Sequence, residues 1–390
     1  MCLPPTGPHG GPIFDGGRGG SAGAPFQMSR PTVRKLAPYV PGKTIEEVQR
    51  DLGLKRIIKL ASNENPLGSS PKAMAALRHI DRLHLYLDDT YPELKEKIAS
   101  PYGLHSENVV LGHGSNELVN IACETLLEAG DEAIMAVPSF SLYRLAASLQ
   151  GARVVEVPLR GGVHDLPAML EAITPRTKLV FICDPNNPTG TAIAPADWRA
   201  FVARVPENVT LLVDQAYREY MGANTVDAVD MVRERPNTIV LRTMSKIYGL
   251  ASLRFGYGFA DAETTGWLNR VRLPFNISRP AALGAAGALD DEEFVMQSIG
   301  ANLAGKAFVC NEFERLGLHV YPTEANFYAV EVPATATRAY TDLLHRGIIV
   351  RSGDALAMPG RLRITVGSPE ENGALIDAFE ELLPAWRTAA

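Results

Sequence analysis

The stretch RTMSKIYGLASLRFGYG at residues 242–258 follows a short apolar run, and a strand is predicted over residues 239–242. Thr243, Ser245 and Lys246 come directly after this strand, and Arg254 follows eight residues beyond the lysine. In open α/β sheets, ligands bind beyond the carboxyl ends of the strands. A single lysine is usually a solvated surface residue, but two hydroxyls, an amine and a guanidinium at this position mark a candidate site.

Outward from this stretch, short apolar runs alternate with helical patterns between about residues 105 and 260. Runs that are nearly continuously apolar, each followed by a helix, indicate a parallel sheet covered on both faces. The helix that begins at Ser115 carries an apolar stripe, and we expect it to end at Gly130. Strands are predicted at residues 109–111, 133–137, 154–157, 179–183, 211–214 and 239–242.

The pattern changes after residue 276, first to helices at 281–289 and 292–316 and then to strands at 327–332, 348–351 and 362–366. This texture predicts a smaller α+β domain, and 390 residues are too many for one compact core. The first 27 residues are rich in Gly and Pro, with little apolar surface to offset the entropy of ordering. We therefore expect a disordered leader at 1–27, an N-terminal segment at 28–62 that packs with the small domain, a large domain at 63–275 and a small domain at 276–390.

Composition argues against several classes of protein. The net charge is −6 and the basic residues are scattered, so nucleic-acid binding is not expected. The sequence shows no apolar run near the roughly 20 residues that span a bilayer and no signal-peptide core, which favours a cytoplasmic protein without membrane contact. The eight histidines lack metal-site spacing, so no metal is expected, and the four widely spaced cysteines are predicted to be reduced thiols.

Two of the other predicted strand ends lead into groups that suit a flat, phosphorylated ligand. Ser115 and Asn116 open a helix after a glycine turn, and the free amides of a helix N-terminus bind phosphate. Phe140 follows the next run, where its ring could stack on such a ligand. Taken alone, the first feature is more often a capped loop and the second a core aromatic.

Two further strand ends carry hydrogen-bonding groups. Asn187 lies between prolines in PNNPTG, where a rigidly held amide could bond a ring hydroxyl, although the segment could also be a plain turn. Asp214 ends the run LLVD, with Tyr217 three residues on. A carboxylate there could pair with a cationic ring nitrogen or simply cap a helix.

Together these motifs resemble the fold type I aminotransferases, and among them the histidinol-phosphate aminotransferase family. The resemblance covers residues 30–386. It implies an α/β fold of the fold type I PLP-dependent transferases, with a mostly parallel sheet between helices in a large domain plus a smaller α+β domain, and pyridoxal 5'-phosphate as cofactor. It rests on ASNENPLG at 61–68, NNPTG at 186–190, VDQAY at 213–217, the stretch at 242–258, ANF at 325–327, GIIVR at 347–351 and LRITVG at 362–367.

The resemblance implies catalytic roles for Lys246, Asp214 and Tyr217. Lys246 would form a Schiff base with the cofactor and then act as general base, for which its pKa must fall toward neutral. Asp214 would keep the pyridine nitrogen protonated, so that the ring accepts electrons. Tyr217 and Asn187 would bond the ring's phenolic oxygen, and Phe140 would stack on the ring.

The resemblance also implies residues that hold phosphate and substrate. Arg363, helped by Arg351 and with Asn326 nearby, would bind the amino donor, glutamate or 2-oxoglutarate, because a guanidinium accepts carboxylate and phosphate alike. The segment at 274–276 is expected in the same cleft. Tyr86 would reach the phosphate in the neighbouring subunit of a homodimer. The cofactor phosphate would be held by Ser115, Asn116, Thr243, Ser245 and Arg254.

The expected reaction is amino transfer between L-histidinol phosphate and 2-oxoglutarate, in histidine biosynthesis. An aromatic amino acid aminotransferase and, less favoured, a PLP-dependent decarboxylase share the same frame. Departures from the family pattern at Asn116, Gln215 and Leu87 leave the donor open. A ligand-sensing transcription regulator is disfavoured, because the roughly 30 residues before the matching region are too few and too Gly-rich for a helix-turn-helix.

Overall fold

The computed structural model describes residues 29–34, 36 and 42–388. The leader expected at residues 1–27 therefore lies outside the described residues. The chain divides into two units, residues 1–37 and 38–390. The described part of the first unit includes the short helix α1 (Pro31–Arg34). The helices and strands from α2 to α14 belong to the second unit.

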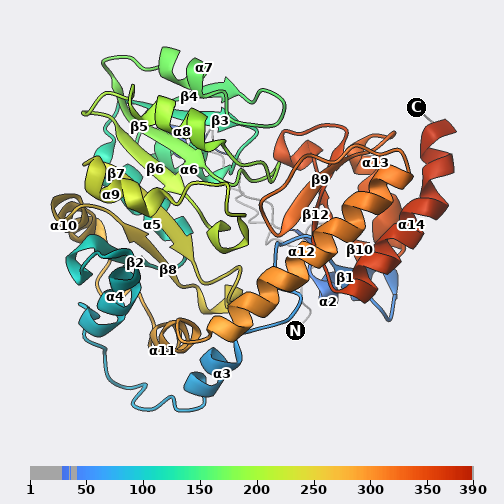
Figure 1. Ribbon diagram of the computed structural model, residues 1–390, viewed down its shortest axis with the longest axis horizontal. Helices are drawn as coiled ribbons and strands as arrows, with labels where there is room; N and C mark the ends of the chain where they lie inside the picture. The colour runs from blue at the N-terminus through green and yellow to red at the C-terminus, as the bar shows by residue number, and fades with distance from the viewer. Residues whose placement is uncertain (1–28, 35, 37–41, 389–390) are drawn as a thin grey trace, which may run out of the picture. The chain divides into compact units, whose positions relative to one another are not determined.

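A seven-stranded sheet forms the centre of this unit (Figure 1). Five neighbouring strands are parallel, and β8 runs antiparallel to both β7 and β2. The mostly parallel sheet predicted from the sequence is confirmed, while the short strand β8 was not among the predicted strands. The order is β2 (Val109–Gly112), β8 (Gly256–Phe259), β7 (Thr238–Thr243), β6 (Thr210–Asp214), β5 (Thr177–Cys183), β3 (Glu132–Val137) and β4 (Arg153–Pro158).

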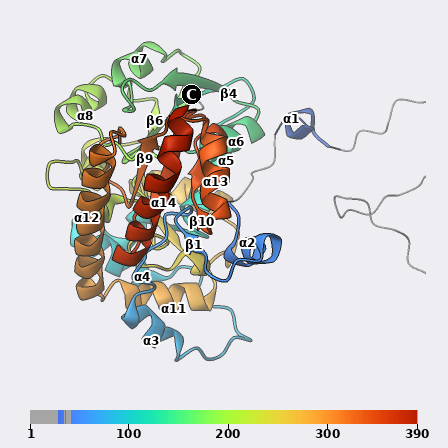
Figure 2. The ribbon, with the colours of Figure 1, turned by 90° about the vertical axis from the view of Figure 1, so that its right-hand side faces the viewer.

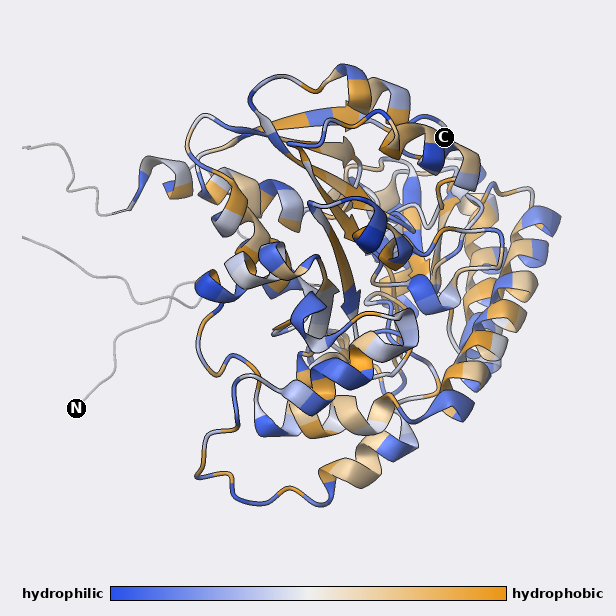
Figure 3. Cartoon of the chain, turned by 60° about the vertical axis from the view of Figure 1, so that its left-hand side comes forward, coloured by the Kyte–Doolittle hydropathy of each residue, from blue (hydrophilic) through white to orange (hydrophobic). Residues whose placement is uncertain are grey.

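Helices cover both faces of this sheet, and its strands are accordingly largely apolar (Figure 3). Successive side chains of a strand point to opposite faces. In β5, Val180 and Ile182 join one core while Leu179 and Phe181 join the other. One face is covered by α5 (Ser115–Leu126), α6 (Leu142–Leu149) and α10 (Ala262–Val271), and the other by α4 (Pro92–Ala99), α8 (Pro195–Val202), α9 (Met231–Glu234) and α11 (Arg279–Ala288).

The last third of the chain builds a second, antiparallel sheet in the order β11-β12-β9, with a core of its own. The strand expected at 348–351 is split in two, because Ile348 and Ile349 pair with β1 whereas Arg351 and Ser352 pair with β12. The last third contains α12 (Glu292–Arg315), β9 (Phe327–Glu331), α13 (Ala336–His345), β10 (Ile348–Ile349), β11 (Arg351–Ser352), β12 (Arg361–Thr365) and α14 (Pro369–Thr388). Two elements from near the start of the unit, α2 (Ile45–Leu52) and β1 (Ile58–Lys59), pack with them.

The domain limits expected from the sequence stay a prediction. Helix α11 lies beside α3 (Pro71–Leu77) in Figures 1 and 2. Its residues Ala281, Ala285 and Ala288 belong to a core of the seven-stranded sheet. Packing therefore groups α11 with the large sheet, although it follows the boundary expected at residue 276.

Helix α5 ends earlier than its sequence suggests. Its last helical residue is Leu126, and Leu127 is already extended. Gly130 has a positive φ of 98°, but it belongs to a separate turn in which the Asp131 amide donates to the Glu128 carbonyl at 3.1 Å. This turn redirects the chain into β3, so Gly130 is not the residue that terminates the helix.

Gly256 on β8 lets the N-terminus of α5 come against the sheet. A Cβ at this position would lie 2.3 Å from the Ser115 amide nitrogen and 2.5 Å from the Gly114 carbonyl carbon. We expect Gly256→Ala to lower the free energy of unfolding by about 1–3 kcal/mol, because backbone must move. Gly266→Ala on α10, where a Cβ meets nothing within 4 Å, is the matched control and should be neutral or slightly stabilising. Equal urea midpoints for both variants would contradict this account.

Candidate active site

A cavity of about 400 Å³ lies where the carboxyl ends of the large sheet's strands face the second sheet. Its lining comes from segments separated by up to about 320 residues, from Gly42 to Arg363. Most of the site residues predicted from the sequence are brought together here. They are Ser115, Asn116, Phe140, Asn187, Asp214, Tyr217, Thr243, Ser245, Lys246, Arg254, Arg351 and Arg363.

Asp214 presents a buried carboxylate at the end of β6, with 5% of the residue exposed. Burial raises its pKa, whereas hydrogen bonds to the ionised form and the charge of Lys246 act in the opposite direction. The Tyr143 hydroxyl donates to Oδ2 at 2.8 Å, and the Ala216 amide donates to Oδ1 at 3.1 Å. The Tyr143 ring stacks on Phe181 with centroids 4.8 Å apart, so packing fixes the donor. The carboxylate is thus held in one orientation.

The sequence prediction did not include Tyr143. It lies on the buried face of α6 and reads there as a core aromatic. The available signal was its hydroxyl, since a buried tyrosine normally finds a hydrogen-bond partner. No sequence pattern named Asp214 as that partner, because 71 residues separate the two.

Lys246 lies in the turn after β7, and its Nζ donates to the Ser62 carbonyl at 3.0 Å. Burial lowers the pKa of Lys246 to about 8, and the positive charges of Arg363 and Arg254 act in the same direction. Glu64 and Asp214 act in the opposite direction. A substantial fraction of this amine is therefore neutral at physiological pH, as a general base requires.

The N-terminus of α5 and the turn after β7 together form an anion-binding corner. The first amides of a helix lack intrahelical partners and attract anions. Arg254 Nη1 donates to Ser245 Oγ at 3.3 Å, and Thr243 Oγ1 donates to the same oxygen at 3.0 Å. A Cβ on Gly114 would lie 2.3 Å from Arg254 Nη2, so only glycine lets the guanidinium approach the loop this closely.

Arg363 connects the second sheet to the site. Its Nη1 donates to Asn187 Oδ1 at 2.8 Å, its Nη2 donates to the Ala61 carbonyl at 2.5 Å, and its guanidinium lies 5.4 Å from the centroid of the Phe327 ring. Arg351 is the register partner of Arg363 on the neighbouring strand β11. Two guanidinium groups from paired strands thus line one part of the cavity.

Asn63 reaches Tyr217 from the segment after β1. Asn63 Nδ2 donates to the Tyr217 hydroxyl oxygen at 2.9 Å, and the Asn63 amide donates to Thr365 Oγ1 at 2.9 Å. Its φ of 54° is left-handed, which asparagine tolerates better than most residues. Asn63 belongs to the motif at 61–68 but was not predicted as a site residue, because its partners lie 154 and 302 positions away.

Two predicted site residues and one predicted segment do not line the cavity. Asn326 is buried outside the cavity lining, where Nδ2 donates to the Asn63 carbonyl at 3.0 Å, so its role toward a substrate stays a prediction. Tyr86 is 80% exposed and packs on Phe275, with ring centroids 4.4 Å apart. The segment at 274–276, expected in the cleft, lies beside Tyr86 instead.

Within the described part of the chain, no helix has the length and apolarity needed to cross a membrane. Among the same residues there is no group of three or more His, Cys, Asp or Glu side chains that could hold a metal ion. Cys123, Cys183 and Cys310 are free thiols, and Cys2 lies outside the described residues.

Residues 55–379 match the family model described as aminotransferase class I and II. The chain belongs to this family. It is 46% identical over 357 residues to a histidinol-phosphate aminotransferase of Moorella thermoacetica, covering 91% of this chain and 92% of that one. It is 44% identical to histidinol-phosphate aminotransferase 2 of Carboxydothermus hydrogenoformans over 91% of this chain and 99% of the relative.

Solved structures give the same answer for the fold. The histidinol-phosphate aminotransferase of Sinorhizobium meliloti, crystallised with pyridoxal-5'-phosphate, superposes with a TM-score of 0.83 at 26% identity, over 94% of this chain and 99% of that one. A Thermus thermophilus aspartate aminotransferase double mutant superposes with a TM-score of 0.79 at 23% identity, over 92% and 100% of the two chains. The fold type I aminotransferase architecture predicted from the sequence is confirmed.

The lowered pKa of Lys246 can be measured directly. In protein freed of bound ligand, acylation of Lys246 followed by peptide mass spectrometry should reach half its maximal rate near pH 8, against about 10.4 for an ordinary lysine. Arg363→Met should move this midpoint upward, because a removed positive charge no longer disfavours the ammonium form. A half-maximal rate near pH 10 in the protein without the Arg363→Met substitution would contradict the environment assigned to Lys246.

Proposed function

We propose that the protein is a pyridoxal-phosphate-dependent aminotransferase that moves an amino group between L-histidinol phosphate and 2-oxoglutarate, acting as a cytoplasmic homodimer in histidine biosynthesis. The observation that carries this proposal is the single cavity that joins a buried carboxylate, a lysine of lowered pKa and an anion-binding corner. Relatives at 41–46% identity over most of the chain bear the name of this enzyme.

The residues present fit pyridoxal phosphate. The corner formed by the first turn of α5, Thr243, Ser245 and Arg254 offers amide, hydroxyl and guanidinium donors to a phosphate. Asp214 offers a fixed negative charge to a protonated ring nitrogen, and Phe140 offers an aromatic face for stacking. When bound, the cofactor supplies an electron sink for the pair released as a substrate Cα–H bond breaks.

The existing hydrogen bonds of Tyr217 and Asn187 use an acceptor atom of each side chain and leave a donor available. Because Asn63 already donates to the Tyr217 oxygen, the phenol's own proton remains available for an acceptor in the cavity. Because Arg363 occupies Asn187 Oδ1, the Asn187 amide group can donate through Nδ2. Both residues can therefore act as donors to a phenolic oxygen on the ring.

Lys246 is the proposed base. Its Nζ, which donates to the Ser62 carbonyl in this structure, would take the proton from the substrate Cα and, within the same half-reaction, deliver it to the C4′ carbon of the cofactor. A pKa of about 8 makes the amine both a competent acceptor and a competent donor near neutral pH. Desolvation by the cavity walls is the main cause of that pKa.

Arg351 and Arg363 support a doubly anionic donor. A guanidinium binds phosphate or carboxylate through two parallel hydrogen bonds, and two of them on paired strands offer more positive charge than one carboxylate needs. A phosphorylated amino alcohol and 2-oxoglutarate both satisfy this pair. Phenylalanine brings a single carboxylate with one negative charge to the same pair, which disfavours the aromatic amino acid aminotransferase.

The homodimer is supported by an exposed aromatic pair. Tyr86 lies on the surface with Phe275, and Leu83, Leu85 and Leu273 are exposed apolar residues from the same two segments. Apolar surface of this kind is usually covered by a partner. In the family pattern, the tyrosine at the position of Tyr86 reaches the phosphate site of the other subunit.

A donor screen tests the proposal. With 2-oxoglutarate as acceptor, kcat/KM for histidinol phosphate should exceed that for phenylalanine by at least about a hundredfold, because a phosphate presents more negative charge to Arg351 and Arg363 than a carboxylate does. A preference for phenylalanine would establish the aromatic enzyme instead. Carbon dioxide release without an acceptor keto acid would establish a decarboxylase.

The contact between Tyr143 and Asp214 gives a second test. Tyr143→Phe removes the donor to Asp214 Oδ2 while the ring keeps its stacking on Phe181, and kcat should fall roughly tenfold, the value of one hydrogen bond to a charged group. Tyr328→Phe is the control, since Tyr328 is buried in the core of the second sheet. It should change kcat less than about twofold. Similar losses in both variants would show that Tyr143 acts only through packing.

A further inference from the structure

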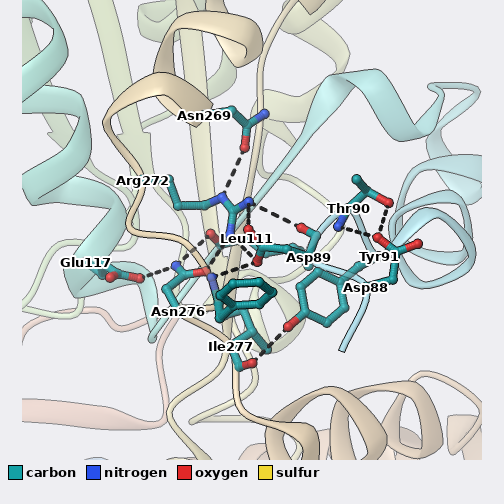
Figure 4. Close-up of polar contacts among 11 residues, drawn as sticks. Asp88, Asp89, Thr90, Tyr91, Leu111, Glu117, Asn269, Arg272, Asn276 and Ile277 are labelled. Atoms are coloured by element: carbon teal, nitrogen blue, oxygen red, sulfur yellow. Dashed lines mark hydrogen bonds and ion pairs between the residues drawn. The ribbon is translucent and has the colours of Figure 1, made fainter. Parts of the chain in front are cut away.

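Arg272 follows the end of α10 and makes an unusually complete set of hydrogen bonds (Figure 4). Its side chain is 11% exposed. Nη1 and Nη2 donate to the two carboxylate oxygens of Asp89 at 2.9 Å each, which is the bidentate geometry of the strongest ion pairs. Nη2 also donates to the Asp89 carbonyl, Nη1 to Asn276 Oδ1 and Nε to Asn269 Oδ1. All five donors of the guanidinium are thereby used.

This cluster ties two segments that are about 185 residues apart in the sequence. Besides Arg272, Asp89 accepts from the Phe275 amide at 3.0 Å. Tyr91, two residues further on, donates its hydroxyl to the Ile277 carbonyl at 2.8 Å (Figure 4). Phe275, fixed in this way with a left-handed φ of 56°, is the residue against which the Tyr86 ring lies. The Arg272 cluster therefore fixes the support on which Tyr86 rests.

The segment that carries Tyr86 has little packing of its own. Of residues 81–90, all but Leu87 and Asp89 are exposed. Holding such a segment in one conformation costs conformational entropy for each ordered residue, and few buried apolar contacts offset it. Close to Tyr86, the Arg272–Asp89 pair, the Tyr86–Phe275 ring contact and the packing of Leu87 against the core of the large sheet offset this cost.

The same cluster also contacts the anion-binding corner of its own chain, through Asn276. Asn276 Nδ2 donates to Glu117 Oε2 at 2.6 Å, and this oxygen also accepts from the His113 amide at 2.6 Å. His113 begins the turn that presents the first amides of α5. Removing Arg272 could thus disturb its own cavity through Asn276 or another cavity through Tyr86, and an experiment must separate the two.

We propose that Arg272 is a positioning residue that acts in trans, holding Tyr86 in place for the cofactor phosphate bound in the partner subunit. This inference rests on the proposed homodimer and cofactor. The main contribution of Arg272 to cofactor retention comes from the ion pair with Asp89, because that pair orders the exposed segment. The link through Asn276 and Glu117 makes only a minor contribution.

The first step measures cofactor release from the holoenzyme, as the loss of borohydride-trappable cofactor on Lys246 in the presence of a scavenger. Arg272→Met and, independently, Asp89→Asn should each release cofactor roughly ten- to a hundredfold faster, the loss expected from a hydrogen bond to a charged group. Arg270→Met is the matched control, because Arg270 is an exposed arginine in the last turn of α10, two residues before Arg272. Unchanged release in both Arg272→Met and Asp89→Asn would overturn the proposal, and Asp89→Asn remains informative if Arg272→Met fails to fold.

The second step uses hybrid dimers carrying two affinity tags. When an Arg272→Met subunit is paired with a Lys246→Ala subunit, the only trapping lysine lies in a cavity that receives Tyr86 from a subunit with Arg272 intact. Release should return to within about twofold of the unmodified dimer, because no hydrogen bond at that cavity is lost. When a doubly substituted Lys246→Ala/Arg272→Met subunit is paired with an unmodified one, release should be as fast as in the Arg272→Met homodimer.

The opposite pattern, fast release in the first hybrid and normal release in the second, would show that Arg272 acts on its own cavity and would overturn the proposal. A monomeric protein in sedimentation would overturn it as well. Because the readout is cofactor release rather than turnover, it is independent of the amino donor. A protein that fails to transaminate histidinol phosphate but shows the trans pattern would refute the proposed substrate and leave the role of Arg272 standing.

Discussion

Two charged groups at neighbouring strand ends constrain the rest of the site. Parallel pairing sets Asp214 on β6 opposite Leu241 on β7, so the turn that carries Lys246 begins just beyond the carboxylate. Asp214 is buried and Lys246 is partly buried, and desolvation disfavours the charged form of each. They are kept apart by separate anchors, Tyr143 and the Ala216 amide for Asp214 and the Ser62 carbonyl for Lys246. The space between these anchors is what a flat, charged cofactor would occupy.

The segment after β1 joins the two sheets around that space. The Leu60 amide donates to the Ile349 carbonyl, and the Leu60 carbonyl accepts from the Thr365 amide. These two bonds join the segment to strands β10 and β12. The next residues bond to groups that follow strands of the large sheet. The Ser62 carbonyl accepts from Lys246 Nζ, and Asn63 Nδ2 donates to the Tyr217 hydroxyl oxygen. Arg363, proposed to bind substrate, and Lys246 and Tyr217, proposed to act with the cofactor, are therefore all bonded to this one segment.

Local signals in the sequence were sufficient for the groups at strand ends and insufficient for their partners. Asp214 and Lys246 could be predicted because they lie at or shortly after the end of an apolar run, and Arg254 because it belongs to the same motif eight residues beyond the lysine. The hydroxyl of Tyr143, the amide of Asn63 and the Arg272–Asp89 pair could not, because each meets a partner at least 71 positions away, and such contacts depend on strand register and helix packing. The bond from Asn326 to the Asn63 carbonyl could not be predicted for a similar reason, since the motif around Asn326 indicates its neighbourhood but not the direction of its side chain.

Peptide mapping after borohydride reduction of the protein as purified tests the central assignment most directly. The reduced pyridoxyl group should be found on the peptide that contains Lys246, and Lys246→Ala should carry no covalently attached cofactor. A pyridoxyl group on any other lysine, or covalent trapping that persists in Lys246→Ala, would contradict the account.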